Sequence, residues 1–291
     1  MTIWIIAAAA LVTVASAVRS TWSPCGLSML ASITPLAETG RGNRFRTTGI
    51  WFVAGSTAGG LTLGLGMAVL AAGVKTLALS ATIIGVVALA ASALAVVSDA
   101  GVKGIRVPVH YRQVNERWLD QFRPWVYAAG FGWQIGTGLA TYITTAAVYL
   151  MIVLTSLAGH PLWAVVVGTG FGLVRGLSVL LGRSITSPEA LRAFHFKFYA
   201  AGPKVGRITE IAQMAAAAAV GWALSPVVGA TALVAFAAAG LWLTRRRGKS
   251  ETQADQTRAD HGAGPGAGPG DNAGADTGAG DAPLRGQVTA R

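Results

Sequence analysis

The sequence predicts an all-α protein that crosses a membrane several times. Its 291 residues are 53% hydrophobic and only 12% charged, whereas about a quarter of the residues in an ordinary soluble domain are charged. Four stretches, 49–74, 76–98, 124–174 and 211–244, carry no charged residue, and each exceeds the roughly 20 residues with which a helix spans hydrocarbon. The run "ATIIGVVALAASALAVV" lacks the two-residue alternation of a membrane β-barrel strand. The spans are therefore expected to be helices.

The first apolar segment, about residues 3–37, is predicted to be a membrane helix interrupted at "SPCGLSML". The alternative is a signal peptide cleaved after Ala15-Ser16-Ala17. Signal peptides normally carry positive charge before their apolar region, and here only the amino terminus precedes it. We therefore expect this segment to remain as the first span.

The remaining segments bring the expected number of spans to seven. Spans at 49–74 and 76–98 are followed by a fourth segment at about 125–157 and a fifth around Gly168. One helix over 208–244 would be about 55 Å long, which favours a turn at Ser225-Pro226 and two short spans.

The basic residues predict the orientation. Seventeen of them fall in alternate connections and after the last span, against Lys75 alone in the others. Because cytoplasmic loops are rich in Lys and Arg, we expect the N-terminus outside and the C-terminus in the cytoplasm, in the plasma membrane. This bias accounts for most of the net charge of +11 without a nucleic-acid partner, and the bilayer is the expected partner.

Two cytoplasmic connections predict short amphipathic helices, in "YRQVNERWLDQF" and "SPEALRAFHFKF". Both are expected to anchor at the membrane surface, and docking of a partner is the alternative. The membrane domain is predicted to cover 1–244. The rest, 245–291, is basic and then rich in Gly, Pro, Ala and Asp, which predicts a disordered cytoplasmic tail.

An internal repeat is predicted between the half-repeats at about 3–98 and 124–224. Each has a long interrupted helix, then a helix with glycines four residues apart, then a third helix. These glycines are Gly55, Gly59, Gly60 and Gly64 in the first half and Gly168, Gly172 and Gly176 in the second. Three spans per half would invert one half relative to the other and place a site near the midplane. The alternative is that the glycines serve only close helix packing.

Two short motifs resemble those of the CcdA and DsbD transmembrane thiol–disulfide carriers. "WSPCGLSML" resembles their Ser-Pro-Cys-x-x-Pro-x-x-Pro motif, and "FGWQIGTGL" is similar to a Gly-Trp-x-x-Cys-x-Gly pattern in their second half. In arrangement the resemblance covers about residues 15–225. It implies thiol–disulfide exchange of the cytochrome c maturation type, with Cys25 as a redox thiol and a thioredoxin-like protein as a partner.

The sequence also departs from this family. Ser28 and Ala31 stand where prolines are expected, Gly136 occupies the place of the second cysteine, and Cys25 is the single cysteine of the chain. Three possibilities remain open for the chain. Cys25 forms a mixed disulfide with a partner, it forms a disulfide between protomers, or the chain is a transporter that kept the fold and lost the redox pair. A lone cysteine can also be a small packing residue. The residues expected at the helix interruptions are Pro24, Gly26, Gly132, Gly136 and Gly138.

Two arginines are candidates for charges within the membrane, and the alternative for Arg19 is that its side chain extends from the end of its span to the membrane surface. Arg19 precedes Cys25 by six residues, and Arg175 has apolar neighbours on both sides. Such residues usually face a cavity or a partner. The candidate acidic partners are Glu38, Asp99 and Glu210.

The sequence leaves three functional alternatives, and the two arginines bear on the first two. An arginine beside Cys25 would make the thiol more reactive. Arg175 could instead bind the solute of a small-solute or anion transporter, and a scaffold that binds partners through its surface helices and tail is a third possibility. The four histidines, His110, His160, His195 and His261, show no ligand spacing, and no phosphate-binding loop is present. No metal or cofactor is expected, and the oligomeric state stays open.

Overall fold

The computed structural model describes residues 2–101, 121–141 and 143–235, and its regular structure there is entirely helical. This confirms the predicted fold class for the described residues. The second surface motif, "SPEALRAFHFKF", lies among them, whereas most of the first one and the tail from 245 lie outside them. The helices are α1 (Thr2–Ser20), α2 (Pro24–Ser32), α3 (Pro35–Gly40), α4 (Phe45–Thr76), α5 (Ala81–Asp99), α7 (Pro124–Gly136), α8 (Ala147–Leu157), α9 (Pro161–Leu177), the 3-10 helix η1 (Ser178–Ser184), α10 (Pro188–Leu224) and a short helix, Pro226–Ala235.

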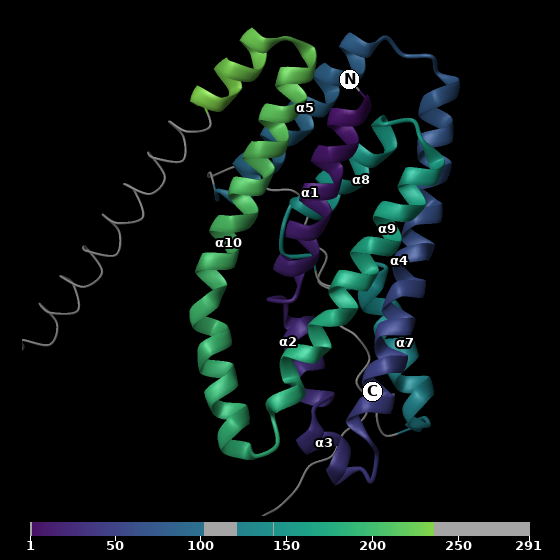
Figure 1. The fold of residues 1–291 in the computed structure, drawn as a ribbon, viewed down its shortest axis with the longest axis vertical. Helices are drawn as coiled ribbons and strands as arrows, with labels where there is room; N and C mark the ends of the chain where they lie inside the picture. Colours follow the sequence, from purple (N-terminus) through teal and green to yellow (C-terminus); the bar gives the residue numbers. More distant parts are fainter. Residues whose placement is uncertain (1, 102–120, 142, 236–291) are drawn as a thin grey trace, which may run out of the picture. The chain divides into compact units, whose positions relative to one another are not determined.

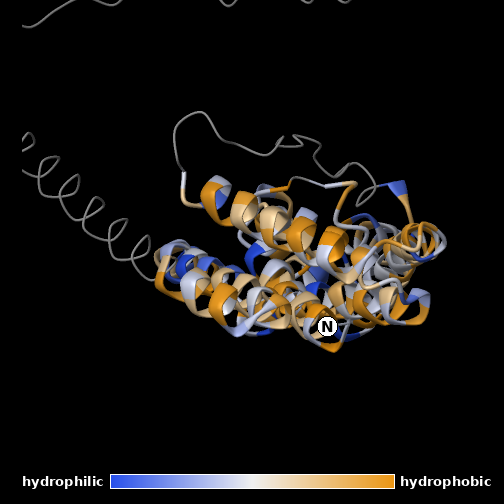
Figure 2. Ribbon diagram, turned by 90° about the horizontal axis from the view of Figure 1, so that it is seen from above, coloured by the Kyte–Doolittle hydropathy of each residue, from blue (hydrophilic) through white to orange (hydrophobic). Residues whose placement is uncertain are grey.

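Four helices of the described residues are long and apolar enough to cross a membrane: α1, α4, α5, and α9 with its continuation η1. Many of their large apolar side chains are exposed, such as Ile3, Val69 and Leu162. Hydrophobic colours dominate the ribbon when it is seen from above (Figure 2). Lipid is the solvent that such surfaces require, so the chain is a helical membrane protein. The number of seven spans stays a prediction, because α7 and α8 are only 13 and 11 residues long.

The first apolar segment is interrupted where the sequence predicts. Helix α1 ends at Ser20, and α2 begins at Pro24, which takes the first helical position. The Ser23 hydroxyl caps α2 by accepting a hydrogen bond from the Gly26 N–H at 3.2 Å. A Cβ atom on Gly26 would lie 2.1 Å from the Thr21 carbonyl oxygen, so this turn requires glycine there.

The fourth segment is also interrupted, between the end of α7 at Gly136 and the start of α8 at Ala147. Gly138 lies in this interruption with a φ of 68°, a conformation that favours glycine. Asp99, the last residue of α5, accepts a hydrogen bond of 2.8 Å from the Ala146 N–H. Its carboxylate thus satisfies a backbone donor at the beginning of α8.

Helix α10 differs from the sequence-based expectation. The predicted surface helix in "SPEALRAFHFKF" continues without a break from Pro188 to Leu224, and Pro203 lies inside the helix. Packing against α1 and α5 favours one continuous helix over two segments, even though proline removes a backbone hydrogen bond. The helix ends at Ser225, whose backbone is extended, and this confirms the turn predicted at Ser225-Pro226. Figure 1 shows α10 beside α1.

The glycine-rich helices of the two predicted halves, α4 and α9, pack directly against each other (Figure 1). A Cβ atom on Gly60 would lie 2.4 Å from the Gly168 carbonyl oxygen, and one on Gly64 would lie 2.9 Å from that of Val165. On another side of α4, a Cβ on Gly55 would lie 2.0 Å from the carbonyl oxygen of Ala129 in α7. The predicted role of these glycines in close packing is confirmed.

Candidate functional site

Cys25 lies in the first turn of α2, two residues after the capping Ser23. Its side chain is buried, with 2% exposed, in a hydrophobic cluster that also contains Met29, Phe131 and Ile135. This cluster joins α2 to the C-terminal part of α7. The thiol therefore faces protein and neither bulk water nor lipid.

Arg175 is the second predicted site residue that the structure places in the interior. Only 2% of it is exposed, and its guanidinium Nη1 donates a hydrogen bond of 2.8 Å to the Ile135 carbonyl oxygen. The guanidinium carbon lies 5.8 Å from the centre of the Phe171 ring, within the range of a cation–π contact. Its Nη2 has no hydrogen-bond partner in the described part of the chain.

Cys25 and Arg175 are linked through Ile135, which packs in the cluster of Cys25 and accepts the hydrogen bond of Arg175. Through these contacts, the beginning of α2, the end of α7 and the last turn of α9 meet at one place. Both predicted interruptions, the one before Cys25 and the one after Gly136, border this place. The cluster of Cys25, Arg175 and the Ile135 carbonyl is called the thiol centre below.

Arg19 is the other arginine that the sequence singled out. It lies at the end of α1, and its guanidinium is directed at α10, with Nε 3.9 Å from where a Cβ on Gly206 would lie. The arginine that contacts the Cys25 cluster through Ile135 is Arg175, which is 150 residues away from Cys25 in the chain.

Gly132 and Gly136 lie inside α7 and face α4. A Cβ atom on Gly136 would lie 2.0 Å from the Ser56 carbonyl oxygen, and one on Gly132 would lie 2.2 Å from that of Phe52. Real Cβ atoms essentially never come so close to backbone atoms. The position where the CcdA pattern has its second cysteine is therefore filled by a helix–helix contact.

Two of the candidate acidic partners are bound elsewhere. Glu38 is fully buried and pairs with Arg41 at 3.0 Å, while the Tyr127 and Thr48 hydroxyls donate hydrogen bonds to its carboxylate. The sequence offered one signal for this network, the Glu38–Arg41 spacing of three residues. Nothing in the sequence indicated that Tyr127 completes it.

Asp99 accepts hydrogen bonds from the Thr145 hydroxyl, the Ala146 N–H and, at 2.7 Å, the side-chain amide of Gln213. Gln213 is fully buried in α10. Asp99 therefore ties α5, α8 and α10 together at the second interruption. Within the described ranges, no three His, Cys, Asp or Glu side chains come together as metal ligands.

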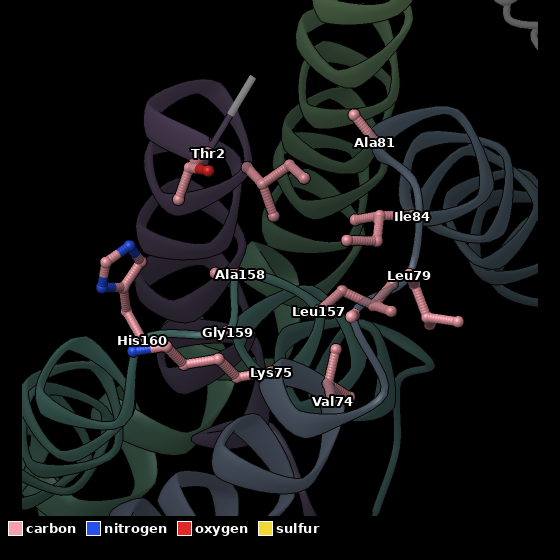
Figure 3. Close-up of a pocket in the computed structure, with 12 residues that line it drawn as sticks. Thr2, Val74, Lys75, Leu79, Ala81, Ile84, Leu157, Ala158, Gly159 and His160 are labelled. Atoms are coloured by element: carbon pink, nitrogen blue, oxygen red, sulfur yellow. The ribbon is translucent and has the colours of Figure 1, made fainter.

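A cavity of about 250 Å³ lies apart from the thiol centre, where α4 ends and α5 and α9 begin. Figure 3 shows its lining, in which Lys75 extends toward His160 beside apolar residues from α5 and α8. The sequence singled out Lys75 only for its effect on topology, and His160 only as a histidine without ligand spacing.

Comparison with known proteins gives similarity to the methylamine utilization protein MauF of two species. The chain is 33% identical to MauF of Paracoccus versutus over 175 residues, which cover 57% of this chain and 61% of the relative. It is 31% identical to MauF of Paracoccus denitrificans over 188 residues, which cover 61% of this chain and 63% of the relative. The chain thus spans about three fifths of these curated relatives. No family model matches it, and no solved structure matches it.

Proposed function

We propose that the chain is a membrane-embedded accessory protein of methylamine utilization that works by thiol–disulfide exchange at Cys25. The similarity to MauF supports the biological process, and the resemblance to CcdA supports the chemistry. The observation that carries the proposal is the thiol centre, where buried Arg175 is hydrogen-bonded to the Ile135 carbonyl oxygen and Ile135 packs in one cluster with Cys25 at the start of α2. Positive charge and a helix N-terminus both promote thiolate chemistry.

The proposed reaction uses one cysteine of this chain and two partner proteins. Deprotonated Cys25 attacks one sulfur of a partner disulfide, and that S–S bond breaks as the mixed disulfide forms. A thioredoxin-like dithiol protein then attacks the partner's sulfur and releases Cys25, and its second thiol completes its own disulfide. Two electrons and two protons pass in total from the dithiol protein to the partner disulfide.

Burial of Cys25 means that α2 has to shift before a partner can reach the sulfur. The adjoining turn is held by Trp22, whose indole N–H donates a hydrogen bond of 2.8 Å to the Phe198 carbonyl oxygen of α10. The rings of Trp22 and Phe198 are stacked, with centroids 4.5 Å apart. In the proposal, this contact keeps the centre closed until a partner binds.

The test is growth on methylamine of Paracoccus denitrificans lacking its MauF, with this chain supplied on a plasmid. The chain is expected to restore growth, and Cys25→Ser is expected to abolish that restoration at equal membrane levels. Acid-quenched cells run on non-reducing gels should show a slower band that disappears with reductant and in Cys25→Ser. Full growth with Cys25→Ser and no such band would overturn the thiol proposal.

A second candidate function is a small-solute or anion transporter, which the unpartnered Nη2 of buried Arg175 favours. A buried guanidinium without a carboxylate partner attracts anions. This function predicts that Arg175→Gln abolishes growth on methylamine while Cys25→Ser leaves it intact. A scaffold, the third alternative from the sequence, would tolerate both substitutions.

The finer membrane arrangement also belongs to this proposal: seven spans, two inverted halves, the N-terminus outside and the tail in the cytoplasm of a plasma-membrane protein. Positive connections on alternate sides support it. Reporter fusions after Ser225 and at the C-terminus test it, because these two positions should report opposite sides of the membrane.

A further inference from the structure

The cavity of about 250 Å³ lies where four candidate spans begin or end. Its lining includes Thr2 and Ile5 of α1, Lys75 near the end of α4 and Ala81 at the start of α5. His160, which immediately precedes α9, completes the rim. Because the ends of spanning helices lie near the membrane surface, this cavity faces the boundary between lipid and water.

The walls and the rim of the cavity differ in chemistry. The walls include the apolar side chains of Ile5, Ile84 and Leu157. The rim carries Lys75 and His160, and the Lys75 Cβ lies 3.9 Å from where a Cβ on neighbouring Gly159 would lie. Figure 3 shows the two side chains on the same side of the cavity. A ligand with an apolar body and a polar head matches this division.

The charge of the rim determines which charge the polar head group of a ligand must carry. None of the twelve lining residues is Asp or Glu, so no carboxylate within the cavity compensates Lys75. Helix α9 begins beside the cavity, and His160 at its N-cap makes no side-chain capping hydrogen bond. The positive end of the α9 dipole therefore adds to the positive charge of Lys75. An anion is attracted here, whereas methylammonium, a cation, is repelled.

The turn that closes the cavity is strained. Ala78 has a φ of 45°, the positive-φ conformation that costs a residue with a side chain free energy. This turn brings Lys75, Ala78 and Leu79 together on the lining. Such strain is often kept at ligand sites.

We propose that this cavity binds an amphiphilic anion, with its oxyanion head at Lys75 and His160 and its apolar chain along Ile5, Ile84 and Leu157. Two sources share this chemistry, a fatty-acid carboxylate and an anionic phospholipid. The site goes beyond the proposed function, because neither Cys25 nor Arg175 lines the cavity.

Native mass spectrometry of the detergent-solubilised full chain tests the proposal with oleate, dioleoyl phosphatidylglycerol, oleyl alcohol and inorganic phosphate as probes. One oleate or one phosphatidylglycerol per chain is expected, and the tighter of the two identifies the source. Oleyl alcohol has the chain without the charge, and phosphate has the charge without the chain. Both are expected to bind at least about tenfold more weakly, oleyl alcohol because it lacks the hydrogen bonds of a charged group and phosphate because it lacks the apolar chain that the walls would bury.

Three variants separate the contributions. Lys75→Gln with His160→Gln should weaken oleate binding at least about tenfold through loss of the charge-assisted contacts. Ala81→Leu should block binding by filling the cavity while both rim residues remain. Lys197→Gln is the control, because it removes one positive charge from an exposed position of α10 outside the cavity. This variant should bind oleate like the unsubstituted protein. All four substituted residues are exposed, and the melting temperature checks folding. Equal binding of oleyl alcohol or phosphate, or full binding by the double variant, would overturn the proposal.

Discussion

The Ser56 hydroxyl donates a hydrogen bond of 2.7 Å to the Gly172 carbonyl oxygen and joins α4 to α9 in the middle of their glycine-lined contact. A Cβ atom on Gly172 would lie 2.2 Å from the Ser56 carbonyl oxygen. The two backbones are thus in contact, and a buried polar group closes the interface. In lipid, where apolar burial offers no driving force between helices, packing of this kind and interhelical hydrogen bonds hold the pair together.

The first prediction concerns this contact. Gly60→Ala should lower the free energy of unfolding by at least about 1–3 kcal/mol, because the new methyl group would meet the Gly168 backbone. Gly66→Ala in the same helix is the matched control, since a Cβ there meets nothing within 4 Å. It should change stability by no more than about 1 kcal/mol, the helix-propensity difference. Thermal unfolding in detergent, followed by tryptophan fluorescence, measures both. Equal melting temperatures for the two variants would contradict this packing.

The second prediction concerns the missing cysteine of the CcdA pattern. Gly136→Cys restores that pattern, yet it should destabilise the protein by at least about 1–3 kcal/mol, because its Cβ would collide with the Ser56 carbonyl oxygen. Gly170→Cys in α9 introduces the same thiol into open space and serves as the control. Melting temperatures and alkylation of the purified proteins check the outcome. A stable Gly136→Cys variant with a disulfide to Cys25 would contradict this prediction, because the two positions would then be close enough to bond as in the CcdA pattern.

The third prediction concerns the buried carboxylate of Glu38. Tyr127→Phe removes the hydroxyl that lies 2.8 and 2.7 Å from its two oxygens. The expected loss of stability is about 1.5–3 kcal/mol, the range for hydrogen bonds to charged groups. Tyr199→Phe removes a hydroxyl from a side chain that is 64% exposed and should have almost no effect. Denaturant unfolding of the solubilised proteins distinguishes them, and a loss of equal size in both would remove the special role of Tyr127.

The fourth prediction concerns Asp99 at the second helix interruption. In Asp99→Asn, an amide that donates replaces a carboxylate oxygen that accepts from Thr145 and Gln213. We expect a loss of about 1–3 kcal/mol from the unsatisfied buried donors. Hydrogen exchange should also quicken at the first amides of α8. Glu189→Gln, a charge loss near the exposed start of α10, is the control and should leave α8 exchange unchanged.

The sequence predicted local features of the fold well because short-range rules determine them. The breaks before Pro24 and at Ser225 follow from capping and proline chemistry, and the glycines of α4 follow from their four-residue spacing. Continuity through Pro203 was not predictable in this way. It depends on packing of α10 against α1 and α5, which local sequence does not encode.

The sequence predicted which residues belong to the candidate site, but it did not predict which of them lie beside one another. The sequence singled out Arg19 and Arg175 alike and did not decide which of them lies beside Cys25. The contact of α7 with α9 and the hydrogen bond from Arg175 to the Ile135 carbonyl oxygen bring Arg175 to the cluster that contains Cys25. The cavity at Lys75 and His160 had no sequence pattern at all, because three distant stretches of the chain, 2–5, 74–84 and 157–160, form it.

The stacked rings of Trp22 and Phe198 connect the turn before Cys25 to α10. Helix α10 is continuous over 37 residues, so the turn that carries Phe198 belongs to the same helix as the part packed on α1. Trp22 is hydrogen-bonded to the Phe198 carbonyl oxygen of α10 and lies three residues before Cys25. The turn before the thiol is therefore connected directly to α10 through Trp22 and Phe198. Access of a partner to Cys25 would therefore require the Trp22–Phe198 contact to α10 to open or to move with α2.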